Sequence, residues 1–178
     1  MNEKDICDID EGLFFERFDG AVVEHYSEVK SEHYILKGQV DRGGKNNKLH
    51  FPRLKVLGNK KRVLYLSSFQ KSADDIYAFY LQQFERKNYK IIYSVYEDEF
   101  EGKPSDWLSS LYLNTTKLIS GMLFVFRGKM LCYISGYSEN SSDKSRRYAS
   151  VFAVNSGKRK GFCGILVQII EKEPVDLS

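Results

Sequence analysis

The chain has 178 residues, of which 42% are hydrophobic and 29% are charged, and this balance excludes a wholly disordered protein. One domain of ordinary size accounts for the length, and it can bury a sufficient core without metals or disulfides. Lys and Arg exceed Asp and Glu by only 27 to 24, so net charge by itself does not indicate a nucleic-acid-binding protein. The aromatic share of 14% favours a sheet-rich domain.

The first forty residues predict an acidic arm followed by strands. Residues 1–12 are polar and mostly acidic, and we expect a mobile arm there. A single α+β domain is expected over 13–173, with a polar tail at 174–178. Between Gly20 and Val40, β-branched and aromatic residues predict two strands separated at 27–28 or 30–31.

The next segment predicts a loop and a hairpin. The glycines and asparagines of 41–48 are typical of a loop. The apolar runs 49–57 and 61–69 predict two strands joined around Gly58-Asn59-Lys60. A hairpin tip projects from its sheet, so we expect charges near this turn to be exposed.

The clearest element is an amphipathic helix over 72–87. Ser72 is a good N-cap, acidic residues occupy the first turn, and apolar residues recur at helical spacing. We expect a stripe made by Ile76, Tyr77, Tyr80 and Phe84 to form core contacts with a sheet.

The remainder predicts a strand at 89–96, a short helix at 105–112 and a run of strands joined by hairpins. The hairpins are expected between 122–126 and 130–137, and between 148–154 and 162–170. Strands clustered in this way favour an antiparallel sheet over a parallel one. The fold class predicted is therefore α+β: an antiparallel sheet of hairpins with one long helix (72–87) and one short helix (105–112) packed on it.

A basic stretch is the one candidate binding site. Between 42 and 62 the chain carries eight positive residues and no acidic residue. Such a run is often only a solvated face, and alternatively contacts an anionic surface such as phospholipid headgroups. The candidate residues are Arg42, Lys45, Lys48, Arg53, Lys55, Lys60, Lys61 and Arg62.

Three cysteines show no metal-binding spacing. Cys132 and Cys163 lie in apolar, strand-like runs, so we expect buried free thiols, with one disulfide left open as the alternative in an oxidising compartment. Cys7 lies in the acidic arm, where we expect it to be accessible to thiol reagents.

No motif for a catalytic, cofactor or metal site is present. The sequence lacks nucleophile-elbow, zinc-protease, phosphate-loop and dinucleotide-binding patterns. His25 and His33 are eight residues apart, too far to share a metal on one straight strand. We therefore predict no catalytic residue, no cofactor and no metal, and leave open an enzyme with a dispersed site.

No apolar run reaches the roughly 20 residues of a transmembrane helix, and Met1 to Glu16 lacks the apolar core of a signal peptide. Two interpretations follow. The protein is cytoplasmic if Met1 is its native start, or periplasmic or secreted if a leader has been removed.

Several segments, in this order, resemble a proteobacterial cell-envelope family of unknown function. The first two are 19–26, in which Gly20 precedes a strand that ends in Tyr26, and 34–38. The third is the helix 72–80, which continues to Phe84, Asn88 and Tyr89. The last two are 147–150, which reads Arg-Tyr-Ala-Ser, and 164–171. The resemblance implies an exported domain, often placed ahead of an OmpA-like peptidoglycan-binding domain. This chain ends at Ser178 without that domain, so wall anchoring is not carried over, and the family supplies no catalytic residue.

These observations predict a noncatalytic exported envelope domain that binds a protein or another envelope partner through a sheet edge or the basic face. One alternative is a secreted factor that contacts anionic membranes or nucleic acid. Of these two partners, the sequence does not favour nucleic acid. The other is the enzyme with a dispersed site.

Overall fold

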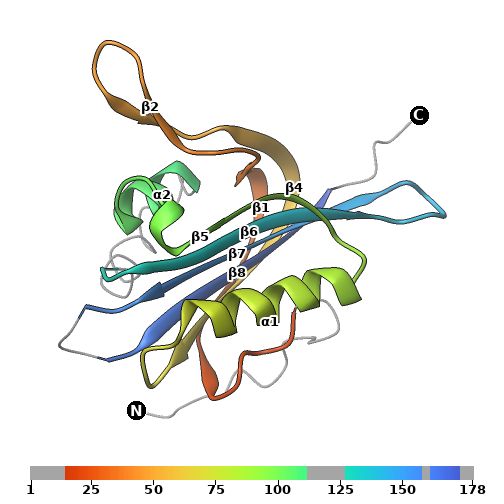
Figure 1. Ribbon diagram of the computed structural model, residues 1–178. Helices are drawn as coiled ribbons and strands as arrows, with labels where there is room; N and C mark the ends of the chain where they lie inside the picture. Colours follow the sequence, from red (N-terminus) through yellow and green to blue (C-terminus); the bar gives the residue numbers. More distant parts are fainter. Residues whose placement is uncertain (1–14, 112–126, 158–160, 173–178) are drawn as a thin grey trace.

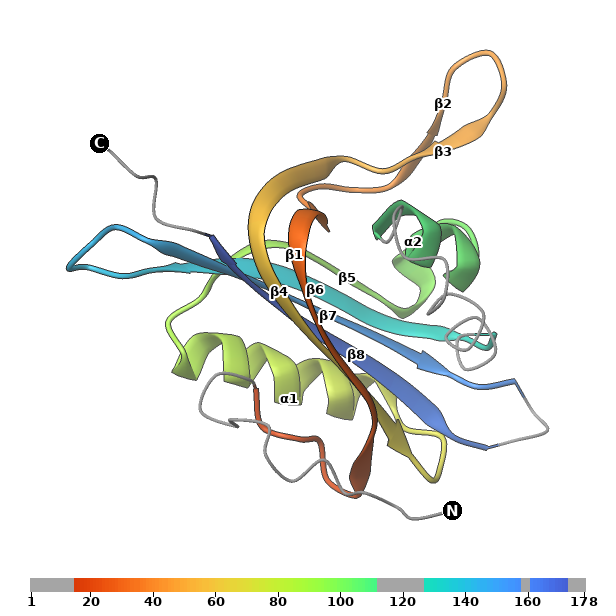
Figure 2. The ribbon, with the colours of Figure 1, turned by 180° about the vertical axis from the view of Figure 1, so that it is seen from behind.

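The protein is an antiparallel sheet with a helix on each face, as Figures 1 and 2 show from opposite sides. The computed structural model describes residues 15–111, 127–157 and 161–172. The strands are β1 Ala21–Leu36, β2 Asp41–Gly43, β3 Lys48–His50, β4 Arg53–Ser67, β5 Lys90–Tyr96, β6 Met130–Glu139, β7 Arg146–Asn155 and β8 Cys163–Lys172. The helices are α1 Ala73–Arg86, the 3-10 turn η1 Glu97–Glu99 and α2 Pro104–Leu111.

Six strands form the main sheet in the order β1-β4-β8-β7-β6-β5, and β2 and β3 form a separate two-stranded ribbon. Every neighbouring pair is antiparallel. The α+β class predicted from the sequence is confirmed.

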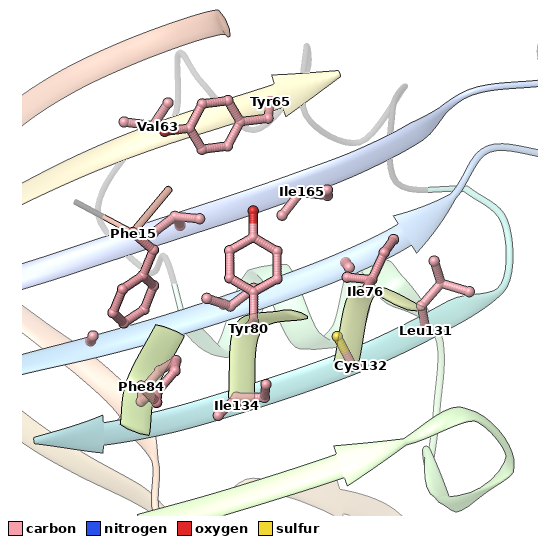
Figure 3. Packing of buried hydrophobic residues seen from close by; sticks show 14 of the residues in the cluster. Phe15, Val63, Tyr65, Ile76, Tyr80, Phe84, Leu131, Cys132, Ile134 and Ile165 are labelled. Carbon is pink, nitrogen blue, oxygen red and sulfur yellow. The ribbon is translucent and has the colours of Figure 1, made fainter. Parts of the chain in front are cut away.

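The helix α1 covers one face, which we call the α1 face. Ser72 occupies its N-cap position with an extended backbone, and Asn88 ends it in the left-handed conformation at φ 57°. Ile76, Tyr80 and Phe84 are fully buried against the sheet (Figure 3). The predicted helix and its core stripe are therefore confirmed, with Tyr77 only partly buried.

The opposite face, the α2 face, is covered by α2 and by the end of β1. Trp107, Leu108 and Leu111 of α2 are buried there. The backbone N–H of Leu36 donates to the Tyr133 hydroxyl at 2.9 Å, and the Ser135 hydroxyl donates to the Leu36 carbonyl at 2.6 Å. Because Tyr133 and Ser135 lie on β6, these contacts show that β1 bends across the α2 face, a curvature visible in Figure 2.

Two predicted breaks in the strands are wrong. β1 runs without interruption, with only a register shift between Val23 and His25, and β4 continues through Gly58-Asn59-Lys60. Gly58 lies against the backbone of Glu171 on β8, where a Cβ atom would collide with the carbonyl. The glycine therefore permits close strand pairing here instead of forming a turn.

Of the remaining predicted elements, some match the structure, one differs from it and some lie outside the described residues. β5, α2 and the β7–β8 hairpin match the expected elements. The predicted loop 41–48 forms the β2–β3 ribbon instead. The predicted strand 122–126 lies outside the described residues, as do the arm 1–12 and the tail 174–178.

Candidate basic binding surface

The fold divides the predicted basic stretch among three environments. Three of the residues lie on the β2–β3 ribbon and its turn. Three others lie on β4 and are exposed or partly buried, and the last two lie on β4 and are buried on the α2 face. In the same order they are Arg42, Lys45 and Lys48; Arg53, Lys55 and Lys61; Lys60 and Arg62.

The β2–β3 ribbon projects from the body of the protein, as both ribbon views show. Residues 41–48 are exposed along its whole tip. Gly44 and Asn47 take positive φ values of 78° and 49°, and the Asn47 N–H donates to the Gly44 carbonyl at 3.3 Å, which closes the turn. The turn thus presents Lys45 and Lys48 to solvent.

An open groove of about 750 Å³ separates the ribbon from α2. Its lining includes three cationic residues, Arg42, Lys48 and Lys103, and one acidic residue, Asp106. The Asp106 carboxylate accepts a hydrogen bond from the Lys103 backbone N–H at 2.8 Å, which caps the first turn of α2. Arg42 also lies 3.3 Å from Glu101. The groove therefore has an excess of positive charge, although part of that charge is paired.

The base of the ribbon is fixed to α2 by aromatic packing. The Phe51 ring packs edge-on against Trp107 with centroids 5.7 Å apart, and the Trp107 indole N–H donates to the Glu101 carbonyl at 2.8 Å. These contacts hold one wall of the groove at a defined position.

The cations at the base and on β4 have partners within the fold. The Arg53 guanidinium donates to the Ser110 carbonyl at 2.8 Å and lies over the Tyr34 ring. Lys55 lies 2.7 Å from Glu32, and Lys61 lies 3.9 Å from Glu171. We assign these three to internal contacts instead of a binding surface.

Lys60 and Arg62 are not at an exposed hairpin tip, so that expectation is wrong. Their exposed fractions are 4% and 0%, because both side chains lie on the α2 face in the middle of the sheet. A second, smaller cavity of about 410 Å³ lies near the end of α1. The ion pairs Arg146–Glu139 and Arg147–Glu171 occupy its lining, so its charges largely cancel.

Nothing in the described ranges suggests a metal centre, since no group of three or more His, Cys, Asp or Glu side chains there is close enough to hold an ion. Likewise, none of the helices in the described part of the chain is both long and apolar enough to cross a membrane.

The two described cysteines are buried free thiols, as predicted. Burial raises the pKa of the Cys163 thiol to about 12 and raises that of Cys132 as well. Because the thiolate is the reactive form, both should resist thiol reagents in the folded protein. Cys7 lies outside the described residues, and its accessibility stays a prediction.

A thiol titration at about pH 8 with an aromatic disulfide reagent tests this expectation. One thiol of three should react in the native protein and all three in denaturant. Rapid reaction of two or three native thiols would contradict the burial of Cys132 and Cys163, whereas reaction of none would contradict the expectation for Cys7.

Comparison with known proteins adds no assignment: no protein-family model matches this chain, and no curated protein matches it.

Proposed function

We propose that the chain is a noncatalytic, exported domain of the bacterial cell envelope that contacts an anionic lipid surface through the β2–β3 ribbon. The proposal of export rests on the resemblance of its segments to the envelope family. The proposal of an anionic partner rests on one observation: the ribbon projects from the body and exposes Lys45 and Lys48 beside the cationic groove.

The shape of the ribbon favours this surface over the β1 edge of the sheet. On that side the main sheet ends at β1, which carries Glu24, Glu28, Lys30 and Glu32 on its exposed positions. Charged residues on an edge strand discourage the addition of another strand. A projecting ribbon, in contrast, can reach a flat surface without any change in the sheet.

Reversal of the two ribbon charges should weaken binding to vesicles that contain phosphatidylglycerol. Each lysine near an anionic surface contributes about 1 kcal/mol, so Lys45→Glu with Lys48→Glu should reduce partitioning by about 30-fold or more. The thermal midpoint should hardly move, because both side chains are exposed. Co-sedimentation with vesicles measures the partitioning.

A matched control is Lys90→Glu with Lys144→Glu, which makes the same change in net charge on β5 and in the turn between β6 and β7. This control should retain most of the binding. Binding of the parent should also fall between ~50 mM and ~150 mM salt because of screening. Absence of parent binding at ~50 mM salt, or an equal loss in both double variants, would refute the proposal.

A further inference from the structure

The groove between the ribbon and α2 has two walls that touch at one point. The ribbon side contributes Lys48, Leu49 and Phe51, and the opposite side contributes Gly102 and Lys103 together with residues of α2. Gly102 has a φ of 85°, and a Cβ atom there would collide with the Leu49 side chain, so the loop before α2 lies directly against the ribbon. Packing between the two walls therefore sets the position of the groove.

One part of the lining is apolar. Leu49 and Phe51 are partly buried, and both pack against the cluster of the α2 face that contains Trp107. Their remaining surface lines the groove. Apolar surface that is held in this way gains free energy when an apolar ligand group covers it.

The other part of the lining is cationic. Lys48 on the ribbon and Lys103 before α2 are exposed, and neither amine forms an ion pair with a residue that the structure describes. Arg42 is left out of this count because it pairs with Glu101. Among the described lining residues Asp106 is the one carboxylate, so two unpaired ammonium groups outweigh it and the groove attracts anions.

We propose that the groove binds a single anionic glycerophospholipid, with the headgroup phosphate beside the two lysines and the glycerol and first acyl carbons against the apolar part of the lining. This inference rests on the lipid contact proposed above and makes that contact a one-to-one site. The side-chain amide of Asn47 also lines the groove and can donate to a phosphate oxygen. The volume of about 750 Å³ is within the roughly 300–1,000 Å³ of small-ligand sites.

A lipid matches both parts of the lining, whereas other anions match only one. A free phosphate engages the lysines but leaves the apolar part in water. An acidic peptide that adds a strand to the ribbon finds only three residues to pair with, because β2 and β3 are each three residues long. The chemistry of the groove therefore favours the lipid.

Isothermal titration of the full chain with dihexanoyl phosphatidylglycerol, kept below the concentration at which it forms micelles, tests this site. The expected result is saturable one-to-one binding. It should be about ten-fold tighter than binding of glycerol phosphate, which lacks acyl chains, and of dihexanoyl phosphatidylcholine, which has no net charge. Equal binding of glycerol phosphate would identify a free-anion site, and equal binding of hexaglutamate would identify an acidic-peptide site. Either result would overturn the proposal.

Lys103→Ala should weaken binding of the soluble lipid about five-fold, and Leu49→Asn should weaken it by a similar factor because it makes the apolar part polar. Lys144→Ala is the matched control, since it removes an exposed lysine from the turn between β6 and β7 and should bind like the parent. If Leu49→Asn fails to fold, the amide spectrum of the parent provides a second readout. Signals from 47–51 and 102–109 should shift with the lipid, and those from 140–145 should not. Equal binding by Lys103→Ala and the parent would contradict the site.

Binding to phosphatidylglycerol vesicles separates the two ways in which the test can fail. If the parent binds vesicles but not the soluble lipid, the groove site is wrong and the ribbon contact stands. If the parent binds neither, the proposed function itself fails.

Discussion

Tyr80→Ala is expected to lower the free energy of unfolding by about 3–5 kcal/mol. The side chain is fully buried in the middle of α1 and faces the sheet at the centre of the core (Figure 3). Its ring packs against Phe15 and Phe79, with centroids 6.4 Å and 5.1 Å away. Truncation removes these contacts and leaves a cavity between α1 and the sheet, since the backbone of the helix remains attached to the sheet by its other buried residues.

Chemical denaturation followed by circular dichroism measures this change. Phe69→Ala is the control, because Phe69 is also aromatic but 70% exposed, and the change there should be within about 0.5 kcal/mol. Similar unfolding midpoints for Tyr80→Ala and the parent would show that the α1 stripe does not form the core.

The helix and the C-terminal strands could be predicted because their patterns agree at every level. In α1 the cap, the charges at both ends and the apolar spacing indicate the same element. In β7 and β8, runs of apolar residues are buried on both faces, as a central strand requires. In each of these segments, all the local sequence patterns indicate the same type of element.

The errors in β1 and β4 have a common physical cause. Both strands carry polar residues where a strand covered by core is expected to be apolar, and β4 also carries Gly58. Sequence patterns treat Gly58-Asn59-Lys60 as a turn, because such residues usually lie in solvent. Here Gly58 accommodates the backbone of β8, and Lys60 belongs to the buried polar region of the α2 face. The pairing with β8, over a hundred residues away, decides this, and no local pattern contains it.

The candidate site was predictable only in part. The excess of cations at 42–48 indicated an exposed basic segment, and the ribbon exposes it. The groove depends on Lys103, which lies far along the chain and next to α2. The burial of Lys60 and Arg62 could have been suspected from one signal, the alternation of these two residues with the apolar Leu64 at the period of a strand.

The stability of the parent should rise with pH through Lys60. Burial, and secondly the charge of Arg62, lower the pKa of Lys60 from 10.5 to about 7 in the folded state. Between these values the unfolded chain binds more protons than the folded chain, so stability is lost as the pH falls and gained as it rises. From about pH 7 to about pH 9 this gain amounts to about 2 kcal/mol.

Lys60→Met should remove that gain and should be at least as stable as the parent near pH 7, because a buried charge is replaced by an apolar side chain of similar volume. The neighbours of Lys60 that the structure describes keep one charge state over this pH range. Arg62 stays charged, and burial lowers the pKa of His33 to about 4, so His33 stays neutral. The strand partners Val29 and Ile170 do not titrate. The contribution of the two buried cysteines is common to both proteins and cancels in their difference.

Unfolding in urea at several pH values gives the two curves, and Lys61→Met supplies the matched control. Because Lys61 is only partly buried and lies 3.9 Å from the Glu171 carboxylate, that variant should keep the slope of the parent. Parallel curves for the parent and Lys60→Met would mean that Lys60 keeps an ordinary pKa in the folded protein.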